Sequence, residues 1–276
     1  MEHLKIKAEL LTEEMLPYIQ KFKNKIFVIK YGGNAMVDDE AKESVMKDIA
    51  LLLNVGIKPV IVHGGGPHIN AAMQKQDITP VFKNGLRVTD DKTMAIICDV
   101  FHEINREIRN ILANFSVNSI EINDCLIAKQ KDKHLGRVGT VIGIMSRKIN
   151  TALNNETIPV ISSIGLDETG NCYNVNADTA ATKIAVNLSA EKLTILTNVN
   201  GVSKKSELIS HLTIDYANDL IKQEIITGGM IPKVEACIEA VQYGCRKAHL
   251  INGIVSHSLL FEIFTNKGVG TEIVKE

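Results

Sequence analysis

The 276-residue chain has no tryptophan, and aromatic residues make up only 4% of it. Stacking platforms for single-stranded nucleic acid are therefore not expected. Its five cysteines are odd in number and include no C-x-x-C pair, which argues against a disulfide framework and against a zinc site. No apolar run is long enough to cross a membrane, and the start MEHLKIKAELL has no continuous apolar segment like that of a secretory leader. We expect a cytoplasmic protein that binds neither nucleic acid nor membrane.

An excess of charge of one sign is also missing, because 31 Lys and Arg stand against 32 Asp and Glu. No overall field favours an anionic polymer or surface, so any basic side chain that matters must act locally. Hydrophobic residues, in contrast, make up 45% of the chain. That content can build the core of one large domain or two modest domains.

Short β-branched runs alternate with amphipathic stretches along most of the chain. The runs predict buried strands at 25–31, 59–63, 116–122, 159–164, 193–199 and 247–251. The stretches between them predict helices at 39–55, 67–76, 90–113, 177–188 and 231–243. This alternation predicts an α/β fold with a largely parallel sheet. A boundary between two lobes is expected near residue 188.

An amphipathic helix is predicted before the first strand, within residues 1–23. Its apolar residues recur at helical spacing, at Leu11, Met15, Tyr18, Ile19 and Phe22. Pro17 predicts a kink or a restart within it. The apolar stripe could cover the core of this chain, or it could form an arm that binds another subunit.

Two glycine-rich segments follow predicted strands, KYGGN at 30–34 and HGGGP at 63–67. Glycines let backbone N–H groups approach an anion, and a following helix adds partial positive charge. Two such loops at one sheet edge would form a phosphate cradle, although each alone could be a tight turn. Neither matches the P-loop or the dinucleotide fingerprint. Lys30 lies at the end of its strand, where open α/β sheets bind ligands. The alternative is that Lys30 is a solvated surface charge that binds no ligand.

Arg87 lies in the segment NGLRVTD, just before a helix that Thr89 or Asp90 could cap. A guanidinium group fits a carboxylate with two parallel hydrogen bonds. The partner could therefore be an acid group on a substrate, or simply a neighbouring acidic side chain.

The segment NVNAD at 174–178 precedes another predicted helix, so Asn176 or Asp178 could be a simple cap or part of a site. Late in the chain, GGMIPK at 228–233 places Lys233 at the start of a helix. A cation gains nothing from the helix dipole there, which indicates either an anionic ligand or a solvated side chain.

Together, six segments resemble the amino acid kinase family, and within it the acetylglutamate kinases. They are IKYGG (29–33), VHGGGP (62–67), NGLRVT (84–89), SSIG (162–165), NVNAD (174–178) and GGMIPK (228–233). The resemblance extends in order over about residues 11–273. It implies a three-layer α/β/α sandwich around a mainly parallel central sheet, with the amino acid substrate in residues 24–188 and the nucleotide in residues 189–276. It implies ATP-dependent phosphorylation of the side-chain carboxylate of N-acetyl-L-glutamate in arginine biosynthesis.

The resemblance also implies roles for individual residues. Lys30 would stabilise the transferring phosphoryl group, Lys233 the ADP side, and Asp178 would orient both lysines. The backbone would hold the γ-phosphate at Gly32, Gly33, Gly64 and Gly65, and the amino acid would be bound by Gly65, Gly66, Arg87, Asn174 and Asn176. Mg²⁺ is expected on the phosphates of ATP rather than on the protein, because no cluster of carboxylates lies beside these motifs.

Two peripheral segments resemble the arginine-inhibited, hexameric branch of these kinases. They are LPYI at 16–19 and HSLLFEIFT at 257–265, the latter followed by GVGT at 268–271. This implies a homo-oligomer, either a dimer or a trimer of dimers in which the N-terminal helices interlace. It also implies an arginine effector site near Tyr18, Glu262, Gly268 and Gly270.

The chain departs from the family pattern at Asn198 and His134, where an Asp is usual, and at Ile254, where an Arg is usual. These departures bear on nucleotide affinity and arginine sensitivity. A kinase for N-acetyl-aminoadipate, aspartate or carbamate is an alternative, because one methylene changes binding by only ~1–3 kcal/mol. A non-catalytic arginine or nucleotide sensor is another, although it would not need both Lys30 and Lys233.

Overall fold

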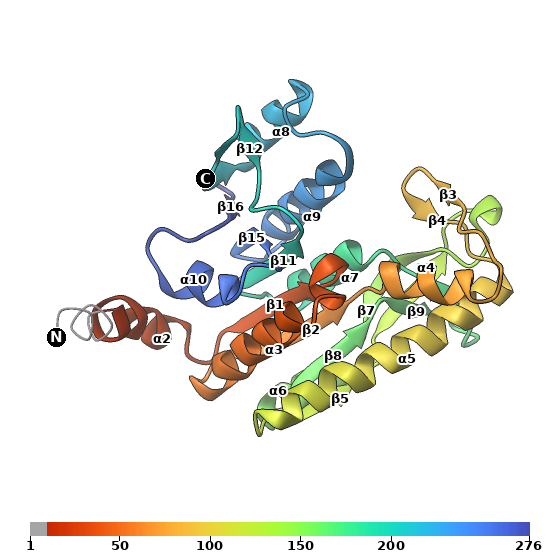
Figure 1. Cartoon of the computed structure of the whole chain (residues 1–276), viewed down its shortest axis with the longest axis horizontal. Coiled ribbons are helices and arrows are strands. Elements are labelled where there is room, and N and C mark those ends of the chain that lie inside the picture. The colour runs from red at the N-terminus through yellow and green to blue at the C-terminus, as the bar shows by residue number, and fades with distance from the viewer. Residues whose placement is uncertain (1–9) are drawn as a thin grey trace.

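The computed structural model describes residues 10–276 and is built around one eight-stranded sheet (Figure 1). All neighbouring strands in this sheet are parallel except β15 and β16. The predicted α/β fold with a mainly parallel sheet is therefore confirmed. The strands, in order across the sheet, are β14 (His211–Thr213), β16 (Thr271–Val274), β15 (Lys247–Asn252), β11 (Lys192–Thr197), β1 (Ile26–Tyr31), β2 (Lys58–His63), β8 (Ile158–Ser162) and β5 (Ser119–Glu121).

Helices cover both faces of the sheet and complete the three layers (Figure 1). Alternate residues of β1 show why, since Phe27 and Ile29 belong to one buried cluster and Val28 to the other. The cluster of Phe27 includes residues of α3 (Asp39–Asn54), α4 (Gly66–Gln74), α5 (Asp91–Asn114) and α10 (Ser258–Phe264). The cluster of Val28 includes residues of α6 (Arg147–Asn154), α7 (Ala177–Asn187), α8 (Ile214–Lys222) and α9 (Ile231–Gln242).

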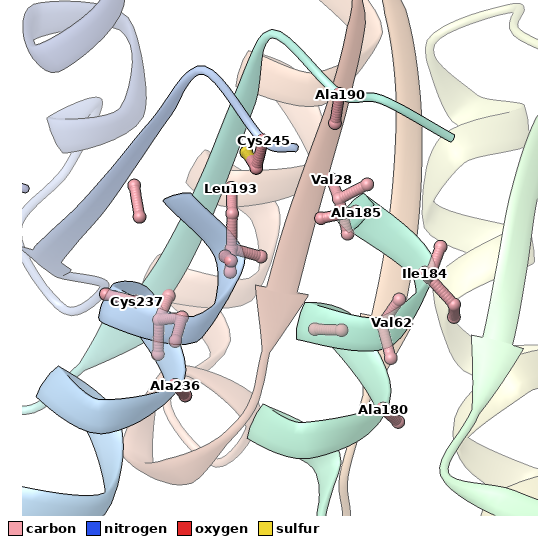
Figure 2. Close-up of a cluster of buried hydrophobic side chains, with 14 of the residues drawn as sticks. Val28, Val62, Ala180, Ile184, Ala185, Ala190, Leu193, Ala236, Cys237 and Cys245 are labelled. Atoms are coloured by element: carbon pink, nitrogen blue, oxygen red, sulfur yellow. The ribbon is translucent and has the colours of Figure 1, made fainter. Parts of the chain in front are cut away.

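Small side chains let α7 and α9 pack closely on the sheet, as Figure 2 shows. Ala180 and Ala185 of α7 lie with Val28 and Val62 of the strands, and Cys237 of α9 is in the same cluster. Burial raises the pKa of the Cys237 thiol well above its ordinary value, so it behaves as an apolar side chain. The close packing brings the first turn of α7 to the same face of β1 that carries Lys30.

A second sheet of four strands, in the order β10-β9-β6-β7, lies beside the main sheet and was not predicted. A Cβ atom at Gly165 would lie 2.4 Å from Cβ of Ala128, so these strands come together only because a side chain is missing. The strands of this sheet are β6 (Leu126–Gln130), β7 (Gly139–Ile144), β9 (Ile164–Leu166) and β10 (Cys172–Asn174). Two separate hairpins pair β3 (Phe82–Lys83) with β4 (Leu86–Arg87), and β12 (Ser203–Lys204) with β13 (Glu207–Leu208).

The N-terminal helix begins as one π-helical stretch, η1 (Leu10–Met15), and continues as α2 (Leu16–Phe22), with Pro17 in the first turn of α2. Figure 1 shows it at one end of the molecule. Phe22 is buried edge-on against Phe27 at 5.1 Å, whereas Leu16 is 46% exposed. The first nine residues of the predicted arm lie outside the described residues.

The main sheet continues without a break across the predicted lobe boundary at residue 188, because β11 pairs with β1 along four residues. The division into lobes of residues 24–188 and 189–276 therefore stays a prediction. None of the helices in residues 10–276 is long and apolar enough to cross a membrane.

Candidate active site

The two glycine loops begin side by side at the centre of the sheet. β1 lies between β2, the next strand along the chain, and β11, which comes much later, so the strand order changes direction at β1 and a crevice opens at its carboxyl end. Tyr31 is in register with His63, and the N–H of Gly64 donates to the carbonyl oxygen of Tyr31 at 3.2 Å. The loop after β1 and the loop after β2 therefore face the same space.

That space is a cavity of about 310 Å³. It gathers residues from both halves of the chain, including both glycine loops and Lys233, which lies in the first turn of α9 just after η4 (Gly228–Met230). Every residue predicted to be catalytic, phosphate-binding or substrate-binding lines it: Lys30, Gly32, Gly33, Gly64, Gly65, Gly66, Arg87, Asn174, Asn176, Asp178 and Lys233.

One carboxylate holds the two lysines at the centre of this cavity. Nζ of Lys30 lies 3.0 Å from Oδ1 of Asp178, and Nζ of Lys233 lies 2.7 Å from Oδ2. Burial by itself would raise the pKa of Asp178, but the charges and hydrogen bonds of the two lysines outweigh it and hold that pKa below its ordinary value. The carboxylate is therefore ionised at neutral pH. It is the anionic partner of Lys233, the lysine at the start of α9 (Ile231–Gln242).

The glycine loops come close to their neighbours. Gly33 has φ +69°, a conformation that favours glycine, and it begins η2 (Gly33–Met36). A Cβ atom at Gly65 would lie 2.7 Å from Cε1 of Phe101 on α5, so this position has no room for a side chain. The main chain is thus exposed to the cavity on one side and pressed against a helix on the other.

Arg87, on β4, is a buried cation without an acidic partner among residues 10–276. One guanidinium nitrogen donates to Oδ1 of Asn70 at 2.7 Å, another contacts Sδ of Met73 at 3.3 Å, and the group lies 4.8 Å from the centre of the Phe82 ring. Burial lowers the pKa of Arg87, but a guanidinium group keeps its charge in proteins. No motif in the sequence pointed to Asn70, Met73 or Phe82 as neighbours of Arg87.

The two asparagines have different partners. Nδ2 of Asn174, on β10, donates to Oγ1 of Thr89 at 3.1 Å, which ties the second sheet to the segment after Arg87. Oδ1 of Asn176 accepts from the N–H of Thr179 at 3.0 Å, so Asn176, and not Asp178, caps α7. In the same way Asp90, and not Thr89, caps α5.

Two of the three departures from the family pattern lie away from the cavity. The N–H of His134 donates to Oδ1 of Asp132 at 2.8 Å within a short turn, η3 (Lys133–Leu135), and Ile254 is exposed. Asn198, at the end of β11, accepts from the N–H of Asn34 at 3.2 Å and so contacts the first glycine loop directly.

A second cavity, of about 290 Å³, lies between the N-terminal helix and the end of the chain. It is lined by all four residues predicted for an effector, Tyr18, Glu262, Gly268 and Gly270. The hydroxyl of Tyr18 donates to Oδ1 of Asn266 at 2.9 Å, and Oε2 of Glu262 accepts from the N–H of Gly270 at 2.9 Å. Burial opposes ionisation of Glu262, but its bond to His249 and these backbone bonds hold its pKa below the ordinary value.

Within the described part of the chain, no group of three or more His, Cys, Asp or Glu residues is arranged to hold a metal ion. The one carboxylate of the first cavity is already shared by two lysines.

Comparison with known proteins agrees with this geometry. Residues 25–252 match the amino acid kinase family. Acetylglutamate kinases from Halothermothrix orenii and from Aquifex aeolicus are each 44% identical to the chain, over the whole of both proteins. The solved N-acetylglutamate synthase from Neisseria gonorrhoeae, complexed with coenzyme A and N-acetyl-glutamate, superposes with a TM-score of 0.87 at 25% identity; the match covers 96% of this chain and 62% of the synthase chain. The chain belongs to the amino acid kinase family, among its acetylglutamate kinases.

Proposed function

We propose that the chain uses ATP to phosphorylate the side-chain carboxylate of N-acetyl-L-glutamate, giving N-acetyl-L-glutamyl 5-phosphate in arginine biosynthesis. The observation that carries this proposal is the meeting of Lys30 and Lys233 on Asp178, beside two glycine loops and in the same cavity as Arg87. One end of the cavity can neutralise a phosphoryl group, and the other can bind a carboxylate.

The nucleophile of this reaction needs no general base. A free side-chain carboxyl group has a pKa of about 4.3 and is ionised at neutral pH. The bond that forms joins a carboxylate oxygen to the γ-phosphorus, and the bond that breaks joins that phosphorus to the oxygen of the leaving ADP. Catalysis therefore consists of holding two anions in line and stabilising the charge that develops between them.

Each charged group then has a role that its contacts support. Lys30, at the end of β1, stabilises the transferring phosphoryl group, and Lys233, at the start of α9, stabilises the charge on ADP. Asp178 bridges the two ammonium groups, with one on each of its carboxylate oxygens. The backbone N–H groups of the glycine loops bind the γ-phosphate.

The amino acid substrate lies toward the second sheet in this proposal. Arg87 binds its α-carboxylate, because the guanidinium is buried, has no acidic partner among the described residues and keeps donors free beyond the two contacts it makes. Asn174 lies next to it through Thr89, and Asn176 and Gly66 line the same region.

ATP enters as its magnesium complex. The described residues offer no set of carboxylates for the ion, and Asp178 is held by two lysines, so the phosphates of the nucleotide carry Mg²⁺. Bound to the nucleotide, Mg²⁺ would neutralise part of the negative charge of the phosphates, and Lys30 and Lys233 would neutralise the rest.

The test is formation of an acyl phosphate. Purified protein is incubated with MgATP and N-acetyl-L-glutamate, and the product is trapped with hydroxylamine as a hydroxamate while ADP release is followed. N-acetyl-aminoadipate, aspartate and carbamate are measured side by side at equal concentration. A higher kcat/KM for any of these acids would overturn the substrate assignment, and ADP release without an acid would overturn the kinase assignment.

For the second cavity we propose an arginine effector. Its lining combines carboxylates, including Glu262 and Glu272, with the basic side chains of Lys21, Arg246 and Lys247, which together suit a cationic side chain and a free α-carboxylate. The expected result is lower activity as arginine is added, with the effect lost in Glu262→Gln. Equal activity at all arginine concentrations would remove this assignment.

The assembly we propose is a trimer of dimers joined by the N-terminal helices. The apolar residues Met15, Tyr18, Ile19 and Phe22 of this helix pack on the core of the same chain, whereas Leu16 is exposed and is available for a contact with another subunit. A variant that lacks residues 1–20 should sediment as a dimer. If it sediments like the full chain, allowing for its lower mass, the helices do not join subunits.

A further inference from the structure

His63 lies directly beneath the second glycine loop, at the end of β2, and does not line the cavity. Its ring is completely buried and stands edge-on to Phe101 of α5, with 5.4 Å between ring centres. Nδ1 of the ring lies 3.0 Å from the carbonyl oxygen of Gly64. A carbonyl oxygen only accepts hydrogen bonds, so this contact is a hydrogen bond when Nδ1 carries a proton.

The other edge of the ring is anchored to α5 and β5. Nε2 lies 3.1 Å from Oδ1 of Asn105, and Nδ2 of Asn105 donates to Oε1 of Glu121 at 3.0 Å. Asn123 donates to the same oxygen of Glu121. This chain of polar groups, which runs from the buried Asn105 to the exposed Asn123, fixes the plane of the ring and therefore the direction in which Nδ1 points.

The carbonyl oxygen that His63 holds determines where the next N–H points. In a trans peptide unit the C=O and the N–H lie on opposite sides, so a Gly64 carbonyl directed down to His63 directs the Gly65 N–H away from it. Within residues 10–276 no hydrogen bond uses the Gly65 N–H, and Gly65 lines the cavity. A free donor is thus aimed into the space where phosphate is proposed to bind.

We propose that His63 is a positioning residue, which turns the Gly65 N–H toward the transferring phosphoryl group by donating from Nδ1 to the Gly64 carbonyl. This inference rests on the proposed kinase function. Without the bond, the peptide unit between Gly64 and Gly65 can rotate, because neither residue has a side chain to restrict it. The donor would then have to be oriented during each reaction instead of beforehand.

The groups around the ring act on its pKa in opposite directions, and burial has the largest effect. Burial lowers the pKa of His63, and His68 on α4 lowers it further, whereas the bonds to Gly64 and Asn105 and the charge of Glu121 raise it. Nδ1 of His102 lies 3.6 Å from Oε1 of Glu121, the carboxylate oxygen that accepts from Asn105. Oδ1 of Asn105 also only accepts, so a doubly protonated ring satisfies both contacts, whereas a ring with one proton leaves one of the two acceptors without a donor. The proposal requires that single proton on Nδ1.

Two matched variants separate this role from simple packing. In His63→Asn the side-chain amide nitrogen can take the place of Nδ1, whereas in His63→Gln it takes the place of Nε2 and leaves the Gly64 carbonyl without its donor. We expect kcat to fall about tenfold or more in His63→Gln, with the KM for N-acetylglutamate changed less than threefold, and to be largely restored in His63→Asn. Equal losses in both variants, or no loss in His63→Gln, would overturn the proposal.

A spectroscopic measurement decides the question without turnover. In ¹⁵N NMR spectra of the wild type, Nδ1 of His63 should show a directly bonded proton across the neutral pH range. Addition of MgADP with inorganic phosphate should shift the Gly65 amide signal in the wild type and in His63→Asn, but less in His63→Gln. A ring protonated only on Nε2 would refute the proposal, even if the wild type proved to phosphorylate another acid.

Discussion

Lys192 provides the sharpest test of the electrostatics around the second cavity. Its side chain is buried at the start of β11, with Nζ 2.8 Å from Nε2 of His249 and 5.3 Å from the centre of the Phe22 ring. Burial lowers its pKa from the ordinary value of 10.5 to about 8, against the opposing charges of Glu272 and Glu262. We expect Lys192→Met to alter the pH dependence of stability.

The size of the effect follows from the two pKa values. A tenfold change in proton affinity corresponds to about 1.4 kcal/mol, so the native state pays about 3 kcal/mol to keep Lys192 protonated. Between pH 8 and 10.5 the unfolded chain binds more protons than the native state, so the stability of the wild type rises with pH in this window. Below pH 8 the cost is fully present.

Lys192→Met removes this cost and leaves Nε2 of His249 without a partner, which costs about 1–3 kcal/mol at every pH. The difference in stability between variant and wild type should therefore shift by about 3 kcal/mol, in favour of the wild type, as pH rises from 8 to 10.5. Urea unfolding at several pH values measures this difference. The control is Lys21→Met, because Lys21 lies over the same Phe22 ring but is exposed. A difference that is constant with pH would refute the reasoning.

Three further predictions concern the first cavity. Lys30→Ala should lower kcat by about a hundredfold or more in steady-state assays with folding intact by circular dichroism, because it removes charge stabilisation of the transition state. Arg87→Ala should mainly raise the KM for N-acetylglutamate, and an unchanged KM would show that Arg87 does not bind the acid. Gly65→Ala should lower both the unfolding temperature and the affinity for MgATP, measured by calorimetry, because its Cβ would lie 2.7 Å from Phe101. The control is Gly170→Ala, where a Cβ meets nothing within 4 Å but φ is +84°, so this variant measures the cost of backbone strain without a clash.

Much of the main sheet could be predicted because its strands are buried on both faces. The predicted strand at 25–31 is β1 (Ile26–Tyr31), and the predicted helix at 39–55 is α3 (Asp39–Asn54). Both have strong local signals, since a parallel strand covered by helices is a continuous apolar run and an amphipathic helix has a regular polar face. The prediction of one strand at 159–164 is wrong, because the run contains the end of β8 and the start of β9, which belong to different sheets.

The second sheet could not be predicted, because β9 and β10 have only three residues each and glycines interrupt the apolar pattern of β7 and β9. Gly139 would place a Cβ 2.6 Å from Cβ of Tyr173, so this residue is a glycine for a reason that depends on a strand 34 positions away in the sequence. The same limit applies to His63. His63 belongs to a glycine-rich segment, and nothing in that segment indicated a role for its side chain. Its partner Asn105 lies in α5, where no motif indicates that this residue contacts a histidine.

The charge of the cavity explains why overall composition revealed so little about function. The whole chain has a formal net charge of −1, yet the charged residues that line the cavity are three cations, Lys30, Arg87 and Lys233, and one carboxylate, Asp178. Burying such cations without partners would be costly, and Asp178 compensates only the two lysines. The remaining positive charge lies in about 310 Å³, where the phosphates of ATP and the carboxylates of the amino acid can neutralise it. A basic protein surface would attract anions of any kind, whereas a buried excess of this size accepts only anions that fit.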